Sequence, residues 1–439
     1  MSPEYLAILM LVIMIVCIML GGHVAIVLGG LAVIFGYLGW GTGIISMFPD
    51  RIFSTCTSFS MEAVTLFIFM GAVLEKSGIA ERLYSTFLVI MGPLRGGLLL
   101  ATILLATLFA ACTGISGAAV VAMGLIALPS MLKAGYEKSI ASGTICSGGG
   151  LGVIIPPSIM LILYGPPGGI SVAKLFTAAI FPGLLLASFY IIYIGVLCYF
   201  KPEIGPALPK SEREKFTLRA KIMMVLTSLV PTLGLIFAVL GSIIFGISSP
   251  TEAAAVGAIG SLIICAIYGQ LTWETLKATC WFTIKTSAFI MLIVVCAGLF
   301  TTVFLGLKGG ELIERWILGL QLGRLGVILL FLGVIFILGM FMDWVGILLV
   351  FLPIAVPITS AVGIDPLWFA ILFCITLQLS YVTPPFSYSV FYLKGVAPPN
   401  VTLMDIYRGV VPYIPLQILA LVLIYIFPDI ALWLPEVLK

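Results

Sequence analysis

The chain has 439 residues, of which 62% are hydrophobic and only 9% are charged, with a mean hydropathy of +1.27. About a quarter of an ordinary globular domain is charged, so this composition excludes a soluble protein and predicts an all-α polytopic protein in a lipid bilayer. The formal net charge of +3 gives no reason to expect a nucleic-acid partner. The nine cysteines lie singly in apolar segments without metal-ligand spacing, so no cofactor is expected.

The first half of the sequence predicts a series of apolar helices. Segments 5–20 and 23–40 precede a polar link around Pro49-Asp-Arg51, and 61–75 is followed by an amphipathic stretch, 77–84, that ends near residue 92. Two short apolar arms, 96–112 and 117–132, flank Thr113-Gly-Ile-Ser-Gly117 and predict a re-entrant helical hairpin. A helix over 138–164 must break at Ser147-Gly-Gly-Gly-Leu-Gly152 and at Pro156-Pro157. A span over 176–200 follows.

The second half predicts the same order of elements. After the basic segment 201–221 come helices near 222–245, 251–269 and 279–304, and an amphipathic stretch at 311–316. Short arms flank Phe341-Met-Asp-Trp-Val-Gly346, and a helix over 366–392 is broken at Thr383-Pro-Pro385. The last predicted span runs from 410 to 427.

A double proline occurs in each half, and the two copies indicate an internal repeat. Pro156-Pro157 and Pro384-Pro385 are 228 positions apart, and the same offset relates Ile126-Ala-Leu-Pro129 to Ile354-Ala-Val-Pro357. Paired breaks in matching halves are typical of secondary transporters. If 201–221 is cytoplasmic, most of the 21 Lys and Arg residues lie inside, which predicts an external N-terminus and two inverted repeats.

Unwound helices free backbone carbonyls, which are neutral oxygen ligands suited to sodium as a coupling ion. Asp343 adds the one carboxylate, although it is also placed to cap the second helix of its hairpin. The candidate sodium ligands of the first site are Thr113, Ser116, Gly150, Val153 and Pro156, and those of the second are Asp343, Gly346, Ser380, Thr383 and Pro384.

Polar and aromatic side chains near the breaks are candidates for a substrate pocket, with aromatic packing as the alternative for the tyrosines. These residues are Ser147, Ser158, Tyr164, Gln378, Tyr381 and Ser387, with Tyr392 as a further aromatic. A membrane-embedded enzyme is the rival class, but one histidine and no metalloprotease motif argue against it. A phosphate-binding loop is absent, so ATP does not drive the chain directly. Paired hairpins fit alternating access better than a channel.

At these residues the chain resembles the large membrane subunit of the tripartite ATP-independent periplasmic (TRAP) transporters, the DctM-like family. The resemblance rests on Ser77-Gly-Ile-Ala, Arg95-Gly-Gly97, the Ser116 tip, Gly135-Tyr136, Ile155-Pro-Pro-Ser158, Phe341-Met-Asp343, Gly363-Ile-Asp-Pro366 and Thr383-Pro-Pro385. It implies the ion transporter superfamily fold, in which a mobile domain moves as an elevator against a scaffold. It also implies sodium-driven import of small organic acids across the bacterial inner membrane.

The resemblance further implies two protein partners, a small four-helix membrane subunit and a periplasmic substrate-binding protein. An ion-coupled transporter that works without a binding protein is the alternative. The second break, Leu377-Gln-Leu-Ser-Tyr-Val-Thr-Pro-Pro385, departs from the commoner family pattern, so both carboxylates and sulfonates stay open as substrates.

The predicted organisation divides each of the two repeats into scaffold helices and a transport domain. Residues 1–60 form the scaffold helices of the first repeat, and 61–200 form the arm, hairpin and broken helix of its transport domain. The basic linker 201–221 is cytoplasmic. Residues 222–275 are the scaffold helices of the second repeat, and 276–439 form its arm, hairpin, broken helix and last span.

Overall fold

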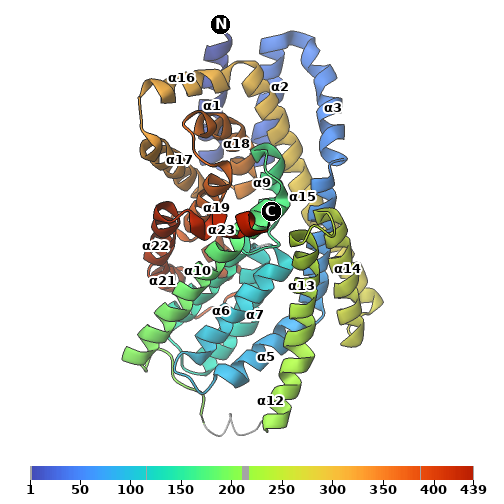
Figure 1. The fold of residues 1–439 in the computed structure, drawn as a ribbon, viewed down its shortest axis with the longest axis vertical. Coiled ribbons are helices and arrows are strands. Elements are labelled where there is room, and N and C mark those ends of the chain that lie inside the picture. The colour runs from blue at the N-terminus through green and yellow to red at the C-terminus, as the bar shows by residue number, and fades with distance from the viewer. Residues whose placement is uncertain (1, 115, 210–216, 386, 439) are drawn as a thin grey trace.

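The computed structural model describes residues 2–114, 116–209, 217–385 and 387–438. In these ranges every regular element is a helix, as the composition predicts. Eight helices in the described part of the chain are long and apolar enough to cross a membrane. The chain is therefore an all-α, multi-pass membrane protein (Figure 1).

The helices of the first half follow the predicted order. They are α1 (Pro3–Met19), α2 (Val24–Trp40), α3 (Ile44–Cys56), α4 (Phe59–Lys76), α5 (Ile79–Met91), α6 (Gly97–Thr113), α7 (Ser116–Lys133), α8 (Lys138–Gly150), α9 (Ile159–Gly168) and α10 (Val172–Phe200). The predicted first hairpin is α6 and α7, and the predicted broken helix is α8 and α9.

The second half contains a second hairpin, α17 and α18, and a second broken helix, α19 and α20. Its helices are α12 (Leu218–Met224), α13 (Val230–Ile244), α14 (Pro250–Ile267), α15 (Trp273–Gly306), α16 (Gly309–Gly319), α17 (Arg324–Gly339), α18 (Trp344–Ala361), α19 (Pro366–Val382), α20 (Tyr388–Val396), α21 (Leu403–Val410), α22 (Tyr413–Ile426) and α23 (Asp429–Val437). A π-helical turn, Val225–Leu229, joins α12 to α13.

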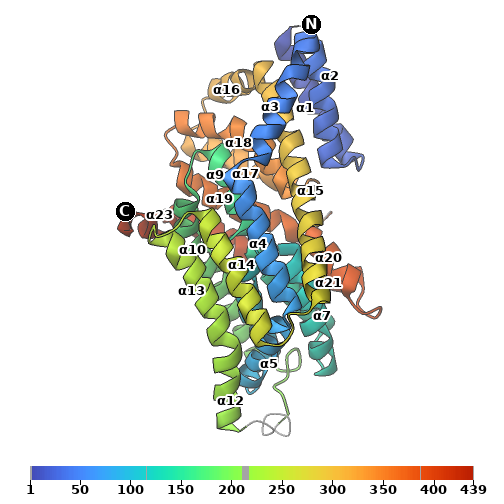
Figure 2. The same ribbon diagram turned by 90° about the vertical axis from the view of Figure 1, so that its right-hand side faces the viewer.

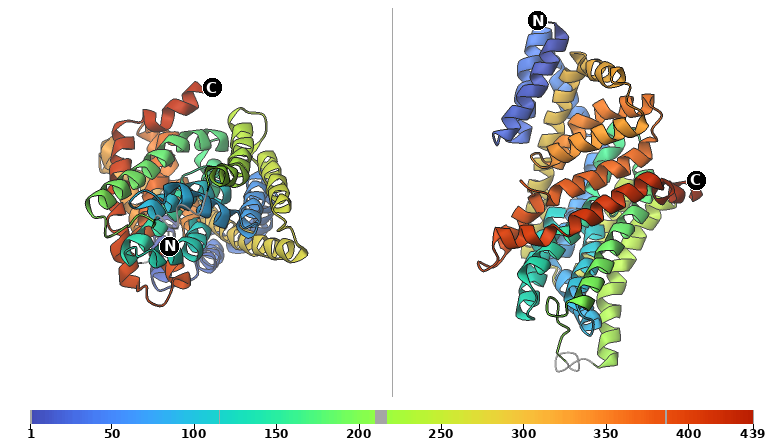
Figure 3. Two further views of the ribbon diagram at one scale, coloured as in Figure 1. Left: turned by 90° about the horizontal axis from the view of Figure 1, so that it is seen from below. Right: turned by 90° about the vertical axis from the view of Figure 1, so that its left-hand side faces the viewer.

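Helix bounds in the two halves coincide at the offset of the sequence repeat. Ser116 and Lys133 bound α7, and the residues 228 positions later, Trp344 and Ala361, bound α18. The arm α5 and the hairpin α6–α7 lie toward one end of the molecule, and α16 and α17–α18 lie toward the other (Figures 1 and 3). Helices α19 to α22 lie between the two hairpins (Figure 3, right).

Two expectations about the elements need correction. Pro49-Asp-Arg51 is not a link but lies inside α3, because apolar residues continue the helix on both sides of the proline. Helices α3 and α4 follow one another along the molecule beside α14 and α15 (Figure 2). Helix α15 is one unbroken helix of 34 residues. The predicted last span, 410–427, is α22, but two short helices that the sequence analysis did not include, α21 and α23, precede and follow it.

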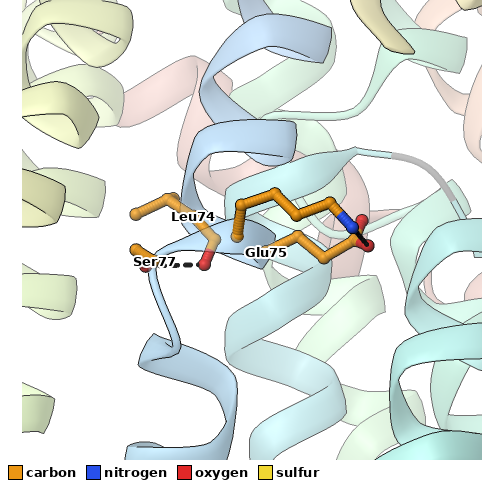
Figure 4. A network of polar contacts seen from close by, with 4 residues as sticks. Leu74, Glu75 and Ser77 are labelled. Carbon is orange, nitrogen blue, oxygen red and sulfur yellow. Dashed lines mark hydrogen bonds and ion pairs between the residues drawn. The ribbon is translucent and has the colours of Figure 1, made fainter. Parts of the chain in front are cut away.

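A sharp elbow joins α4 to the amphipathic arm α5. The two helices meet at 61°, and Gly78 adopts a left-handed conformation with φ +70° that side chains disfavour. The Ser77 hydroxyl donates to the Leu74 carbonyl oxygen at 2.7 Å, and Lys76 pairs with Glu75 at 3.6 Å (Figure 4). The Ser77 bond satisfies a carbonyl oxygen of the last turn of α4, which has no helical partner.

The arm α5 connects the first hairpin to helices of the second half. It packs against α6, and the Thr86 and Ser228 hydroxyls are hydrogen-bonded at 2.8 Å. The Arg82 guanidinium lies 4.6 Å from the centre of the Tyr268 ring, a cation–π contact. The arm therefore lies between the hairpin and the helices α12 to α14.

Candidate functional site

Both predicted helix breaks are present and are built alike. Helix α8 ends at Gly150, a 3₁₀ turn covers Leu151–Val153, and α9 begins at Ile159. Helix α19 ends at Val382, and α20 begins at Tyr388. The Pro156-Pro157 and Pro384-Pro385 peptide bonds are both cis. Backbone polar groups at these breaks lack their helical partners and are available to ligands.

The tip of the first hairpin lies on the first break. A Cβ built on Gly114, which has φ +62°, would lie 2.8 Å from the Pro157 carbonyl oxygen. A Cβ on Gly152 would lie 3.4 Å from the Ser116 amide nitrogen. The structure thus brings Ser116 to the residues between Gly150 and Pro156. Thr113 is the last residue of α6, and its side chain lies outside the part that the structure describes.

Hydrogen bonds fix the shape of the first break. The Ser158 hydroxyl donates to the Val153 carbonyl oxygen at 2.6 Å, which closes the loop around Pro156. A carbonyl oxygen has two lone pairs, so Val153 can still accept a second partner. Every residue from Leu151 to Met160 is buried, so this break lies inside the protein.

The second break carries hydroxyls whose hydrogens are already used. The Ser380 hydroxyl donates to the Leu377 carbonyl oxygen at 2.6 Å, and the Thr383 hydroxyl donates to the Leu379 carbonyl oxygen at 2.7 Å. Both hydroxyl oxygens therefore present lone pairs and act as acceptors or cation ligands. The last residue of α17, Gly339, packs directly against Ser380, where a Cβ would lie 2.1 Å from the hydroxyl oxygen.

Asp343 is the N-cap of α18. Its carboxylate accepts the Val345 backbone N–H at 3.1 Å, so the capping role considered from the sequence is real. The residue is half-buried, and its charge acts on the nearby hydroxyl groups of Tyr381, Tyr388 and Tyr392. A capped carboxylate retains further lone pairs, so capping and cation binding are compatible.

Two of the second-site candidates lie differently from their first-site counterparts. Gly346 faces α2, since a Cβ there would lie 2.8 Å from Cγ1 of Val24, the first residue of that helix. Pro384 and Pro385 are exposed, whereas Pro156 is buried. The second break is therefore open to its surroundings and the first is enclosed.

The substrate-pocket candidates fall into two groups. Tyr164 packs edge-on against Phe373, with ring centres 5.4 Å apart, and Tyr381 packs on Tyr388 at 5.7 Å. Both tyrosine rings thus pack against another aromatic ring, which is the alternative to a substrate contact. By contrast, the Ser147 and Ser387 hydroxyls and the Gln378 amide are buried without a hydrogen-bond partner among the described residues.

Sequence reasoning missed three residues that shape the site. Tyr388 lies within the range of the Asp343 charge, and its spacing of four from Tyr392 on one helix face is a signal that was available. Gly339 and Val24 have no such signal, because their contacts depend on tertiary packing. In the described ranges no three His, Cys, Asp or Glu residues gather, so the site consists of backbone, hydroxyl and single carboxylate oxygens.

Comparisons with known proteins agree with this architecture. A family profile described as "Tripartite ATP-independent periplasmic transporter, DctM component" matches residues 11–430. The C4-dicarboxylate TRAP transporter large permease protein DctM of Pseudomonas aeruginosa is 31% identical over 388 residues, 88% of this chain and 88% of that protein. The isethionate TRAP transporter permease protein DctMQ of Oleidesulfovibrio alaskensis is 30% identical over 92% of this chain and 62% of that protein.

The fold is also similar to a solved structure. The crystal structure of the Alcanivorax borkumensis YdaH transporter matches with a TM-score of 0.64 over 98% of this chain and all of that chain, at 15% identity. The relatives are named as transporter permeases, which supports a transporter and not the rival membrane enzyme. The chain belongs to the DctM component family of the tripartite ATP-independent periplasmic transporters.

Proposed function

We propose that this chain is the large permease of a sodium-coupled importer of small organic anions. The observation that carries the proposal is the meeting of the first hairpin tip with the first helix break. Gly114 and Ser116 lie against Pro157 and Gly152 there, so two separate elements that both carry candidate oxygen ligands meet. Such a set of neutral oxygens suits sodium, which needs no metal-like cluster of acidic and sulfur ligands.

The second hairpin and break supply a second set with different chemistry. Asp343 adds a carboxylate, and the Ser380 and Thr383 hydroxyls have free lone pairs. This set supports a second sodium site or an exit path for the first ion. The ligand roles of Thr113, Gly150, Val153, Pro156, Gly346 and Pro384 belong to the same proposal.

The packing of the two halves on each other supports inverted repeats and elevator movement. Helix α7 of the first hairpin packs on α20, and α18 of the second hairpin packs on α9. Each hairpin is therefore packed against the broken helix of the opposite half. This exchange supports a mobile unit in which both hairpins and both broken helices move together, with α1, α2, α13 and α14 as the scaffold.

The names of the relatives and the residues of the candidate site support small organic anions as the substrate class. One relative is named for C4-dicarboxylates and another for isethionate, a sulfonate. Both kinds of substrate are small anions. At the first break α9 begins beside the hairpin tip, and the positive end of its dipole favours a negative group. The unpaired Ser147 and Ser387 hydroxyls are the donors for such an anion.

The proposal includes two partners and a location. The family description names a tripartite periplasmic system, which supports a periplasmic binding protein and a small four-helix subunit beside this chain in the bacterial inner membrane. The relative named DctMQ is longer than the segment that this chain matches, which supports a joined small subunit there.

Reconstitution tests the proposal. Liposomes containing the chain alone, or the chain with its small subunit, would receive labelled anions with and without the binding protein under an inward sodium gradient. We expect uptake only with all three components and sodium. Equal uptake by the chain alone would support a transporter that needs no binding protein, and uptake indifferent to sodium would refute the coupling.

A further inference from the structure

Gly150 and Gln378 occupy equivalent positions in the two halves, 228 residues apart, and they face each other in space. Gly150 ends α8, and Gln378 lies in α19, two residues before Ser380. A Cβ built on Gly150 would lie 3.5 Å from Gln378 Cγ and 3.6 Å from its amide nitrogen. Their helices, α8 and α19, pack together here. The repeat therefore has a glycine at this position in the first half and a glutamine in the second, and the glutamine side chain lies opposite the glycine.

The Gln378 amide belongs to a buried polar cluster whose members form no well-aligned hydrogen bonds with one another. The Tyr190 hydroxyl on α10 interacts with the side-chain amides of Gln378 and Gln417, the latter on α22. All three side chains are fully buried. Among the described residues, neither the hydroxyl nor the nitrogen and oxygen atoms of the two amides have a well-formed hydrogen bond.

Unpaired buried polar atoms are costly, and natural proteins keep few of them. Here five such atoms belong to one cluster, and one of its members, Gln378, contacts Gly150 at an unwound helix end that carries carbonyls without helical partners. The side chains of this cluster can therefore exchange hydrogen-bond partners with one another when the contact at Gly150 changes. Its position joins the two breaks, since Gln378 is attached to the second break by the chain and contacts the first break in space.

We propose that Gln378 is a positioning residue that couples the two ion sites, an inference that rests on the proposed sodium-dependent function. Occupation of the first break changes the contact at Gly150 and moves the Gln378 side chain. That movement is transmitted through the last turn of α19 to Ser380 and Thr383. Sodium binding at one break thereby raises the affinity of the other.

The test uses the sodium dependence of thermal stability, which requires neither substrate nor partner proteins. The full-length chain in detergent is titrated with sodium chloride, with choline chloride holding the ionic strength constant, and its unfolding temperature is recorded. A ligand that binds the folded state stabilises it according to its affinity. We expect the wild-type response to be cooperative, with a Hill coefficient above one.

Gln378→Met removes the amide and preserves the length of the side chain. We expect its Hill coefficient to fall to one and the half-saturating sodium concentration to rise about fivefold or more, the lower range of ordinary site coupling. Gln417→Met is the matched control, because it removes an equally buried amide from the same cluster without contact to Gly150. It should keep the wild-type Hill coefficient. If Gln378→Met does not fold, Gln378→Asn, which withdraws the amide by one methylene, takes its place.

The outcomes separate this inference from the proposed function. A wild-type protein without any sodium response, and without sodium-driven uptake, contradicts the proposed function itself. A sodium response that is non-cooperative in the wild type, that stays cooperative in both Gln378 variants, or that changes equally in Gln417→Met overturns the coupling role alone.

Discussion

Asp343 offers a clean separation between capping a helix and binding an ion. Its carboxylate accepts the Val345 N–H at 3.1 Å, a bond that an asparagine oxygen can replace. Asp343→Ala removes cap and charge, while Asp343→Asn removes only the charge. Asp365 provides the control, because it caps α19 through the Trp368 N–H at 2.8 Å and is exposed.

The two roles predict different magnitudes. Loss of an N-cap costs about 1 kcal/mol of folding free energy, so Asp343→Ala and Asp365→Ala should be destabilised to a similar extent and Asp343→Asn hardly at all. A sodium ion about 4 Å from a carboxylate at an effective dielectric constant of about 20 gains about 4 kcal/mol. At 1.4 kcal/mol per tenfold, loss of that charge weakens sodium binding by roughly 700-fold.

The assay combines thermal unfolding in detergent with initial uptake rates over a range of sodium concentrations. We expect both Asp343 variants to lose transport at ordinary sodium concentrations, while Asp365→Ala transports normally. If Asp343→Asn is stable and transports with an unchanged sodium requirement, then the carboxylate is only a cap and its place in the second ion site is wrong.

Two further predictions concern movement and packing. The paired changes Val24→Cys and Gly346→Cys place two thiols within disulfide reach across α2 and α18, so oxidation should block transport reversibly if the hairpin moves against the scaffold. Val239→Cys with Gly257→Cys, where a Cβ on Gly257 would lie 3.0 Å from Val239 Cγ2, should crosslink the scaffold helices α13 and α14 without loss of transport. Equal activity of both oxidised proteins would contradict the elevator. Gly409→Ala would place a methyl group 1.8 Å from a carbonyl oxygen of α8 and should lower stability by about 1–3 kcal/mol in thermal unfolding, whereas an unchanged midpoint would show that the helices can separate freely.

Much of this fold is predictable because its signals are local. Double prolines and glycine runs interrupt a helix wherever they occur, so the breaks at Pro156 and Pro384 follow from the sequence. Short apolar arms around a small tip likewise predict the hairpins. Proline is a weaker signal within a longer helical pattern, which is why Pro49 lies inside α3 instead of ending it.

The details of the site depend on contacts between distant segments, and those are not encoded locally. Gly346 was predicted as a ligand of the second ion site, and its contact with Val24 of α2 joins segments that are far apart in the sequence. Gln378 was predicted as a substrate contact, and its position opposite Gly150 becomes visible only once both halves are folded together. The 228-residue offset of the repeat shows that the two residues occupy equivalent positions, but it does not show that they are in contact.

Accumulation of a labelled anion driven by a sodium gradient tests the central claim most directly. Proteoliposomes containing the complete complex are loaded with unlabelled anion at the external concentration, so that only an imposed sodium gradient can drive net accumulation. We expect accumulation with sodium outside, none with equal sodium on both sides, and loss of accumulation in Asp343→Asn. Accumulation that persists without a sodium gradient would contradict the claim.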